Sequence, residues 1–310
     1  MTVKTDSLHI SDWVTAMRIP FASVAVVPFG VGISLALLNG APVSWPASVS
    51  GIIAVLFICI GCYLIGEVTD QAEDRATYEA GRTKFSGGTL SVVEERLAQG
   101  SVIKTAIAFF AVAVILGGFI FFIHMAFWLI GLGIFGGIVA ALYSLPPVRL
   151  VKRGLGELFI GFCYGWLTLV TGYACATGSM PPDSYIWCWP VALTVFNIIL
   201  INEFPDFIPD STTGKKTLVV RLGMEKSQWI YASASILTGA SILVIWLRYR
   251  PFEMIFLAGA LPGILLSLVL AYMVVVKKLW KSTRTIEPVC ALTIVLNHIS
   301  SITIALLVRW

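Results

Sequence analysis

Long runs of apolar residues, separated by short polar segments, dominate the chain. Nine of these runs are long enough to cross a bilayer, whose apolar core of about 30 Å needs roughly 20 residues of helix. Their approximate ranges are 19–39, 50–69, 101–123, 126–144, 155–178, 185–204, 227–248, 253–276 and 287–310. They show little of the short alternating pattern of a membrane barrel. The pattern predicts an all-α polytopic membrane protein with nine transmembrane helices, folded as a single domain over residues 1–310.

Composition supports this prediction. Of the 310 residues, 58% are hydrophobic and 12% are charged, which is outside the range of ordinary soluble domains. The N-terminus is polar and has no short apolar core before a cleavage site, so we expect no removable signal peptide. The six cysteines lie mostly within predicted helices, where we expect them to pack as small apolar residues without disulfides. The net charge of +4 is modest and gives no reason to expect a nucleic-acid partner.

The basic residues sort by loop. Of the 21 lysines and arginines, only Arg248, Arg250 and Arg309 fall outside the N-terminal segment and the loops after the second, fourth, sixth and eighth helices. By the positive-inside rule, the N-terminus is predicted to be cytoplasmic and the C-terminus to lie outside. We expect the cell membrane to be a bacterial or archaeal plasma membrane.

Two acidic clusters follow the second and sixth helices with one spacing. The first is Asp70-x-x-x-Asp74, within "LIGEVTDQAEDRATYEAGRTKFSGG" (64–88), and the second is Asp206-x-x-x-Asp210, within "INEFPDFIPDSTTGKKTLVVRLG" (201–223). Carboxylates four residues apart share a helix face and repel each other unless a cation lies between them. Mg²⁺ suits this position, because it is usually held by one or two carboxylates together with phosphate oxygens. We therefore expect a shared magnesium-diphosphate site, in which Asp70 and Asp74 have no partner within the protein.

Basic, glycine-containing segments follow both clusters, at 81–88 and 214–223. Their cations can meet the phosphate oxygens that the metal ions leave free. The candidates are Arg82, Lys84, Lys215, Lys216 and Arg221. Gly87 and Gly88 would let the backbone approach a ligand closely. Each basic residue could instead only orient the chain or contact anionic lipid, and either acidic cluster alone could be a solvated helix end.

Together these residues resemble the UbiA superfamily of intramembrane prenyltransferases, which has an Asn-x-x-x-Asp-x-x-x-Asp motif after helix two and an aspartate-rich motif after helix six. The similarity includes "MRIP", where Arg18 matches the arginine at the start of the family's first helix, and "YSLPPVRLVKRGLGEL" at 143–158. The resemblance implies nine helices around a central cavity that opens towards lipid, capped by the loops after helices two and six. It also implies Mg²⁺-dependent transfer of an isoprenyl chain from its diphosphate to an acceptor, commonly an aromatic ring.

The resemblance also implies a set of metal ligands. By position these are Asp70, Asp74, Asn202, Asp206 and Asp210. Gly66 stands where the family has the asparagine of the first motif. Either Glu67 or Glu73 supplies the missing oxygen, or the first metal site is rearranged. Pro205 and Pro209 predict that the sixth helix ends or kinks near Asn202, which weakens the argument from helical spacing there.

Further residues are candidates for substrate contacts. Tyr143, at the end of the fourth helix, could form an aromatic wall against a carbocation, although an interfacial tyrosine fits the same position. Lys152 and Arg153 could orient the diphosphate or the acceptor, or could only anchor the topology. Asn297 and His298 lie inside the ninth helix, where we expect them to make interhelical hydrogen bonds.

The motif segments look most like the branch that prenylates 1,4-dihydroxy-2-naphthoate in menaquinone biosynthesis, which gives the predicted acceptor. A family member that cyclises the prenyl chain, or that uses a non-quinone acceptor, would need the same diphosphate site. A cation-coupled transporter would also bury acids among helices. Transporter sites usually lie near the bilayer midplane, whereas these acids follow helix ends. The predicted partners are an isoprenyl diphosphate, an aromatic acceptor and membrane lipid.

Overall fold

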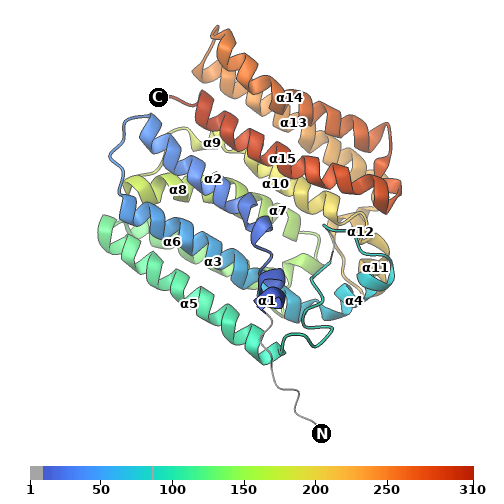
Figure 1. Cartoon of the computed structure of the whole chain (residues 1–310). Helices are drawn as coiled ribbons and strands as arrows, with labels where there is room; N and C mark the ends of the chain where they lie inside the picture. The colour runs from blue at the N-terminus through green and yellow to red at the C-terminus, as the bar shows by residue number, and fades with distance from the viewer. Residues whose placement is uncertain (1–9, 86) are drawn as a thin grey trace.

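A computed structural model describes residues 10–85 and 87–310 of the chain. Lys4, in the predicted cytoplasmic N-terminal segment, lies outside the described residues. Every regular element in the described part is a helix, as the apolar pattern predicts (Figure 1). Nine of the helical segments there are long and apolar enough to cross a membrane.

The nine predicted spans are confirmed, with most ends shifted by only a few residues. They are α2 (Ile19–Leu38), α3 (Trp45–Thr69), α5 (Gln99–His124), α6 (Phe127–Ser144), the continuous run of α7 (Gly156–Ile160), η2 (Gly161–Leu167) and α8 (Thr168–Thr177), the run of α9 (Ser184–Trp187) and α10 (Trp189–Asn202), α13 (Met224–Tyr249), α14 (Met254–Val275) and α15 (Thr283–Leu307). The start of α3 lies five residues before the predicted residue 50, because Pro46 stands in its first turn, where a helix tolerates proline.

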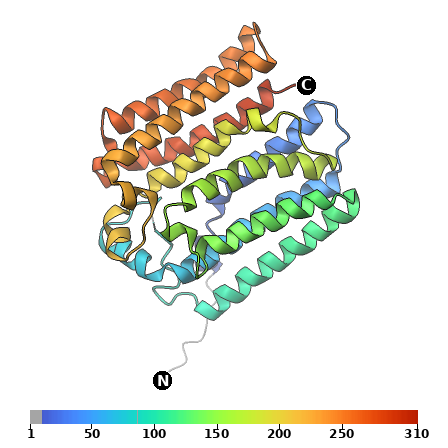
Figure 2. The same cartoon turned by 180° about the vertical axis from the view of Figure 1, so that it is seen from behind.

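The spans pack side by side, with α5 at one edge and the pair α13 and α14 at the other (Figures 1 and 2). Between them, α10 packs against η2, α13 and α15. Asn297 and His298 of the ninth span make the expected interhelical hydrogen bonds. Asn297 Nδ2 donates to Thr194 Oγ1 on α10 at 3.0 Å, and His298 Nε2 lies 3.3 Å from Ser23 Oγ on α2. All six cysteines are free, as expected.

Four short helices gather at one end of the bundle, which we call the acidic end (Figure 1). They are α1 (Ile10–Met17), α4 (Gln71–Glu79), α11 (Phe207–Thr212) and α12 (Leu218–Leu222). Because α3 and α10 both end there, the two acidic clusters lie at the same level. The helices that carry them, α4 and α11, pack against each other, so the clusters face one another as predicted.

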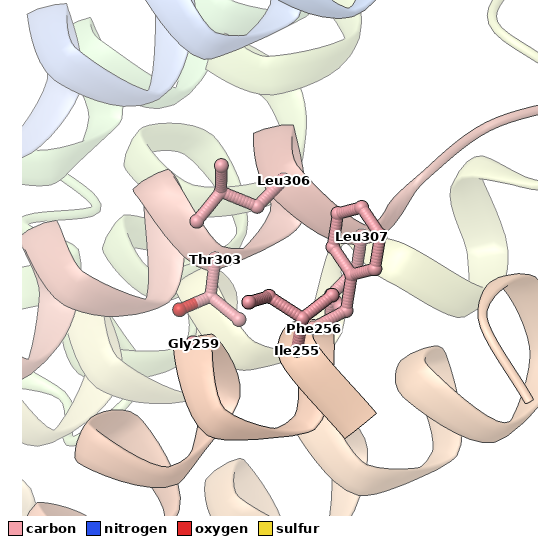
Figure 3. Close-up of a pocket in the computed structure, with 6 residues that line it drawn as sticks. All are labelled: Ile255, Phe256, Gly259, Thr303, Leu306 and Leu307. Carbon is pink, nitrogen blue, oxygen red and sulfur yellow. The ribbon is translucent and has the colours of Figure 1, made fainter. Parts of the chain in front are cut away.

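An apolar hollow of about 230 Å³ lies near the opposite end, between α14 and α15 (Figure 3). Its walls include Ile255, Phe256 and Leu306, and no charged side chain lines it. This hollow is therefore separate from the acidic end, where the predicted chemistry lies.

Candidate active site

The two acidic clusters have the same local structure. Asp70 and Asp206 each occupy the position just before a short helix, and Asp74 and Asp210 lie in the first turns of α4 and α11. In each cluster the amide of the second aspartate donates to the carbonyl oxygen of the first at 2.8 Å. Negative side chains are favourable at the start of a helix because the exposed N–H groups carry partial positive charge.

The prolines of the second cluster do not disturb this arrangement. The prediction that the sixth helix ends or kinks near Asn202 is confirmed, since α10 ends at Asn202. Pro205 lies in the turn that follows, and Pro209 lies in the first turn of α11. A first-turn residue needs no N–H for helical bonding, so Pro209 leaves the spacing of Asp206 and Asp210 intact.

A short backbone segment connects the two clusters. We call Gly87–Thr89 the glycine loop. The Gly87 amide donates to Asp206 Oδ2 at 3.2 Å, and the Gly88 amide donates to Asp74 Oδ1 at 2.6 Å. Since the two amides belong to adjacent residues, the two carboxylate oxygens lie no more than about 10 Å apart.

The glycines of this loop are needed where they stand. A Cβ atom on Gly88 would lie 2.1 Å from Asp74 Oδ2, so any side chain there would force the Asp74 carboxylate to move. Gly87 has a φ of +66°, a conformation that favours glycine. The close backbone approach expected for these residues is therefore present, although in this structure the approach is to carboxylates.

Cations from the segment after α6 meet the first acidic cluster. Arg149 Nη2 lies 2.8 Å from Asp70 Oδ1 and also donates to the Thr69 carbonyl at 2.8 Å. Lys152 pairs with Glu73. The expectation that Asp70 has no partner within the protein is wrong, because the backbone turn after α6 brings Arg149 to it. Sequence reasoning counted Arg149 only as a residue that sets orientation.

Lys215 forms an ion pair with the second acidic cluster. Its Nζ lies 3.4 Å from Asp210 Oδ1. Burial alone would lower the pKa of Lys215, but the carboxylates of Asp210, Asp70 and Asp206 raise it, so the ammonium stays charged. This coupling places one lysine within electrostatic range of both clusters.

Two of the aspartates have raised pKa values. Burial raises the pKa of Asp74 to about 7, although the Gly88 amide opposes this change. Burial likewise raises the pKa of Asp210 to about 6, against the attraction of Lys215. Without a bound cation, these carboxyl groups therefore hold protons at higher pH than ordinary aspartates do.

Tyr143 and Arg18 also reach this region. Tyr143 lies in the last turn of α6, packs close to Gly156 and lies within electrostatic range of Lys215. Arg18 Nη1 donates to the Gly87 carbonyl at 3.2 Å, and its guanidinium lies 4.6 Å from the centre of the Phe21 ring.

The remaining predicted cations lie on the outer side of the loops. Arg82, Lys84, Lys216 and Arg221 are exposed. Arg221 Nε donates to the Lys216 carbonyl at 3.1 Å, so this arginine braces its own loop. A role in substrate binding for these four residues stays a prediction.

Glu67 and Glu73, the candidates for the missing asparagine oxygen, both have protein partners. Glu67 Oε1 accepts the Thr89 amide at 2.6 Å, and Glu67 Oε2 accepts the Thr89 hydroxyl at 2.8 Å. Burial would raise the pKa of Glu73, but the hydrogen bond to Lys152, a backbone hydrogen bond and the charges of Lys152 and Lys215 together outweigh burial, so the pKa is lowered. Glu67 is thus bonded to Thr89 and Glu73 is paired with Lys152, and a role for either as a metal ligand stays a prediction.

Sequence reasoning also missed a buried pair of acids beneath the second loop. Glu157 accepts the Leu218 amide at 2.8 Å, and Glu203 accepts the Val219 amide at 3.4 Å. Burial and the neighbouring Glu157 raise the pKa of Glu203 well above its usual range. The pair caps α12, and no local pattern marks it, because the two residues come from different spans.

The donor atoms at this end are suited to a hard cation. Among residues 10–85 and 87–310, no three histidine, cysteine, aspartate or glutamate side chains come close enough to hold an ion by themselves. Two buried oxygens, Asn202 Oδ1 and Asp210 Oδ2, have no hydrogen-bond partner in the part of the chain that the structure describes. Mg²⁺ commonly takes one or two carboxylates and completes its shell with water and phosphate oxygens. The residues therefore fit Mg²⁺ that arrives with a phosphate ligand better than an ion caged by protein alone.

Comparison with known proteins identifies the family. Residues 25–285 match the UbiA prenyltransferase family. The chain belongs to this family. It is 24% identical over 183 residues to 1,4-dihydroxy-2-naphthoate octaprenyltransferase of Bacillus subtilis (59% of this chain), and that match covers 58% of the relative's own length. It is 26% identical over 255 residues to 2-carboxy-1,4-naphthoquinone phytyltransferase of Synechocystis, covering 81% of this chain and 79% of the relative.

A solved UbiA structure supports the fold. The UbiA homolog from Archaeoglobus fulgidus, bound to DMAPP and Mg²⁺, is similar with a TM-score of 0.66 over 92% of this chain and 97% of that chain. The sequence identity is 16%, so the similarity is evidence for the fold alone. The predicted UbiA-type helical fold is confirmed.

Proposed function

We propose that this chain transfers an isoprenyl group from a prenyl diphosphate to an aromatic acceptor within the membrane, with Mg²⁺ as its cofactor. The observation that carries the proposal is the meeting of the two aspartate clusters, whose Asp74 and Asp206 accept amides of adjacent residues. Membership of the UbiA family and the names of the relatives support the same reaction.

The leaving diphosphate needs positive charge where negative charge develops. Mg²⁺, held by Asp70, Asp74, Asn202, Asp206 and Asp210, would supply much of that charge. Lys215 adds a fixed ammonium within range of both clusters. Arg149 and Lys152 lie on the neighbouring segment, and each can exchange its carboxylate partner for a phosphate oxygen.

The other half of the proposed reaction is the formation of the carbon–carbon bond to the acceptor. The allylic C–O bond breaks, both electrons leave with the diphosphate, and a ring carbon of the acceptor attacks the allylic cation before losing a proton. Water would capture that cation, so the apolar spans around the site serve to exclude it. The ring of Tyr143 can stabilise the cation through its π face. The isoprenoid tail gains about 0.8 kcal/mol per buried CH₂ among the helices.

For the acceptor, we propose 1,4-dihydroxy-2-naphthoate, and with it a role in menaquinone biosynthesis. The names of two relatives, a naphthoate prenyltransferase and a naphthoquinone phytyltransferase, support a bicyclic aromatic acceptor. By the charge of the loops, the acidic end is proposed to face the cytoplasm.

Product analysis tests the proposal. Purified protein is incubated with labelled farnesyl or geranylgeranyl diphosphate, with or without Mg²⁺, and with 1,4-dihydroxy-2-naphthoate or other aromatic acceptors. We expect prenylated naphthoate and free diphosphate only with Mg²⁺. A cyclised hydrocarbon formed without acceptor would overturn the transferase assignment, and a different prenylated acceptor would overturn the naphthoate assignment.

Two matched variants localise the activity. Asp206→Asn should abolish Mg²⁺-dependent product formation. Asp183→Asn makes the same chemical change at the opposite end, where Asp183 lies 3.6 Å from Arg248, and should keep wild-type activity. Equal activity in the two variants would contradict the placement of the site.

A further inference from the structure

Glu67 makes an unusual set of contacts for an acid beside a proposed metal site. It belongs to the last turn of α3 and is 3% exposed. Both of its carboxylate oxygens accept hydrogen bonds from one residue, Thr89, through the amide at 2.6 Å and the hydroxyl at 2.8 Å. One lone pair on each oxygen is thus used by the loop, so Glu67 is tied to Thr89 at both oxygens.

Thr89 is held on its other sides as well. Its hydroxyl lies 2.7 Å from Ser91 Oγ, and its carbonyl accepts a hydrogen bond from Arg96 Nη2 at 3.0 Å. Arg96 in turn pairs with Asp12 on α1. Thr89 is thus the anchored end of the glycine loop, and Glu67 supplies two of the bonds that anchor it.

The anchored end determines where the rest of the loop lies. Thr89 directly follows Gly88 and Gly87, whose amides donate to the two aspartates that the loop bridges. Three consecutive amides therefore point at three carboxylates from different parts of the chain. Movement of Thr89 would move both glycine amides and change the separation and orientation of those aspartates.

We infer that Glu67 is a positioning residue, which holds Thr89 so that the glycine loop sets the geometry of Asp74 and Asp206 for cation binding. The inference deepens the proposed function and rests on it. It also accounts for the departure at Gly66, because the neighbouring acid acts through the loop and does not replace the missing asparagine as a ligand. Residues that orient metal ligands typically change metal affinity by about 10–100-fold when they are removed.

Four variants separate positioning from direct ligation. We expect Glu67→Gln and Thr89→Val each to raise the Mg²⁺ concentration for half-maximal activity by about 10-fold or more. Their double variant should be no worse than Glu67→Gln alone, since the hydroxyl bond that Thr89→Val removes is one of the two that Glu67 accepts. Thr89→Ser keeps the hydroxyl and should restore the wild-type Mg²⁺ requirement.

The opposite pattern would overturn the inference. If Thr89→Val shows the wild-type Mg²⁺ requirement while Glu67→Gln does not, Glu67 acts as a ligand. Additive effects in the double variant would also show that the two residues act separately.

A second measurement does not depend on turnover. Hydrogen exchange of the metal-free protein should show faster exchange at the Gly88 and Thr89 amides in Glu67→Gln than in wild type. Glu253→Gln, an exposed acid at the opposite end, is the control and should leave these amides unchanged. Unchanged exchange in Glu67→Gln would overturn the positioning role. Faster exchange in a protein whose wild type transfers no prenyl group would support the loop contact while the proposed function fails.

Discussion

Replacing Lys215 with methionine tests the charge arrangement most directly. Lys215 Nζ lies 3.4 Å from Asp210 Oδ1, and the two side chains are 17% and 2% exposed. At an effective dielectric constant of 20, two unit charges at that distance attract by about 5 kcal/mol. Desolvation of the pair offsets much of this attraction. Methionine keeps a flexible apolar stem, so the substitution removes mainly the charge.

We expect this variant to lose turnover without losing its metal. A preorganised group that stabilises developing negative charge typically contributes about 10²–10³-fold in kcat, or about 2.7–4 kcal/mol. The same loss should apply here, because Lys215 lies within range of both aspartate clusters. Asp210 would no longer be paired with an ammonium. Therefore the Mg²⁺ concentration for half-maximal activity should stay the same or fall.

Steady-state release of diphosphate, measured over a range of Mg²⁺ concentrations, gives both kcat and the Mg²⁺ concentration for half-maximal activity. Lys226→Met is the control, since Lys226 is an exposed lysine at the start of α13, and it should keep wild-type rates. An unchanged kcat in Lys215→Met would refute the role in stabilising the leaving group. A rise in the Mg²⁺ requirement that accounts for all of the loss would show that Lys215 acts by shaping the metal site.

Other consequences can be measured on the same preparation. Gly88→Ala would place a methyl group 2.1 Å from Asp74 Oδ2, so transferase activity should fall by about 10²-fold or more, while Gly66→Ala, where a Cβ meets nothing within 4 Å, should remain active. In EDTA, the melting temperature should fall as pH rises from about 4 to about 7. The reason is that the raised pKa values let Asp74 and Asp210 hold protons in the folded state that the unfolded chain has already released. Excess Mg²⁺ should reduce this fall. Cys62→Ala should keep most activity, and its complete loss would contradict the assignment of this cysteine to packing.

The spans and the relation of the two clusters could be predicted from the sequence. A membrane segment must satisfy its backbone hydrogen bonds internally, so long apolar runs leave little alternative to helices. An even number of crossings separates the ends of α3 and α10, which places Asp70 and Asp206 at the same level. The spacing of the aspartates survives because each pair lies at the start of a short helix.

The contacts within the site could not be predicted in the same way. Arg149 lies 79 positions from Asp70 in the sequence, and its approach depends on the conformation of the turn after α6. Thr89 lies 22 positions from Glu67 and belongs to a loop with no periodic pattern. The short helices α4 and α11 carry too few apolar residues to be recognised by periodicity. In each case tertiary packing, not local propensity, decides the partner.

The balance of charge at the acidic end also bears on the order of binding. The two clusters hold five carboxylates, which are Asp70, Glu73, Asp74, Asp206 and Asp210. Three cations pair with them, which are Arg149, Lys152 and Lys215. The internal pairs reduce the repulsion among the acids, and the raised pKa values of Asp74 and Asp210 reduce it further by retaining protons. A bare diphosphate would bring more negative charge to two clusters whose carboxylates already outnumber the cations paired with them. Under the proposed function we therefore expect a divalent cation to accompany or precede the diphosphate, and its arrival should release protons in the pH range where those two aspartates titrate.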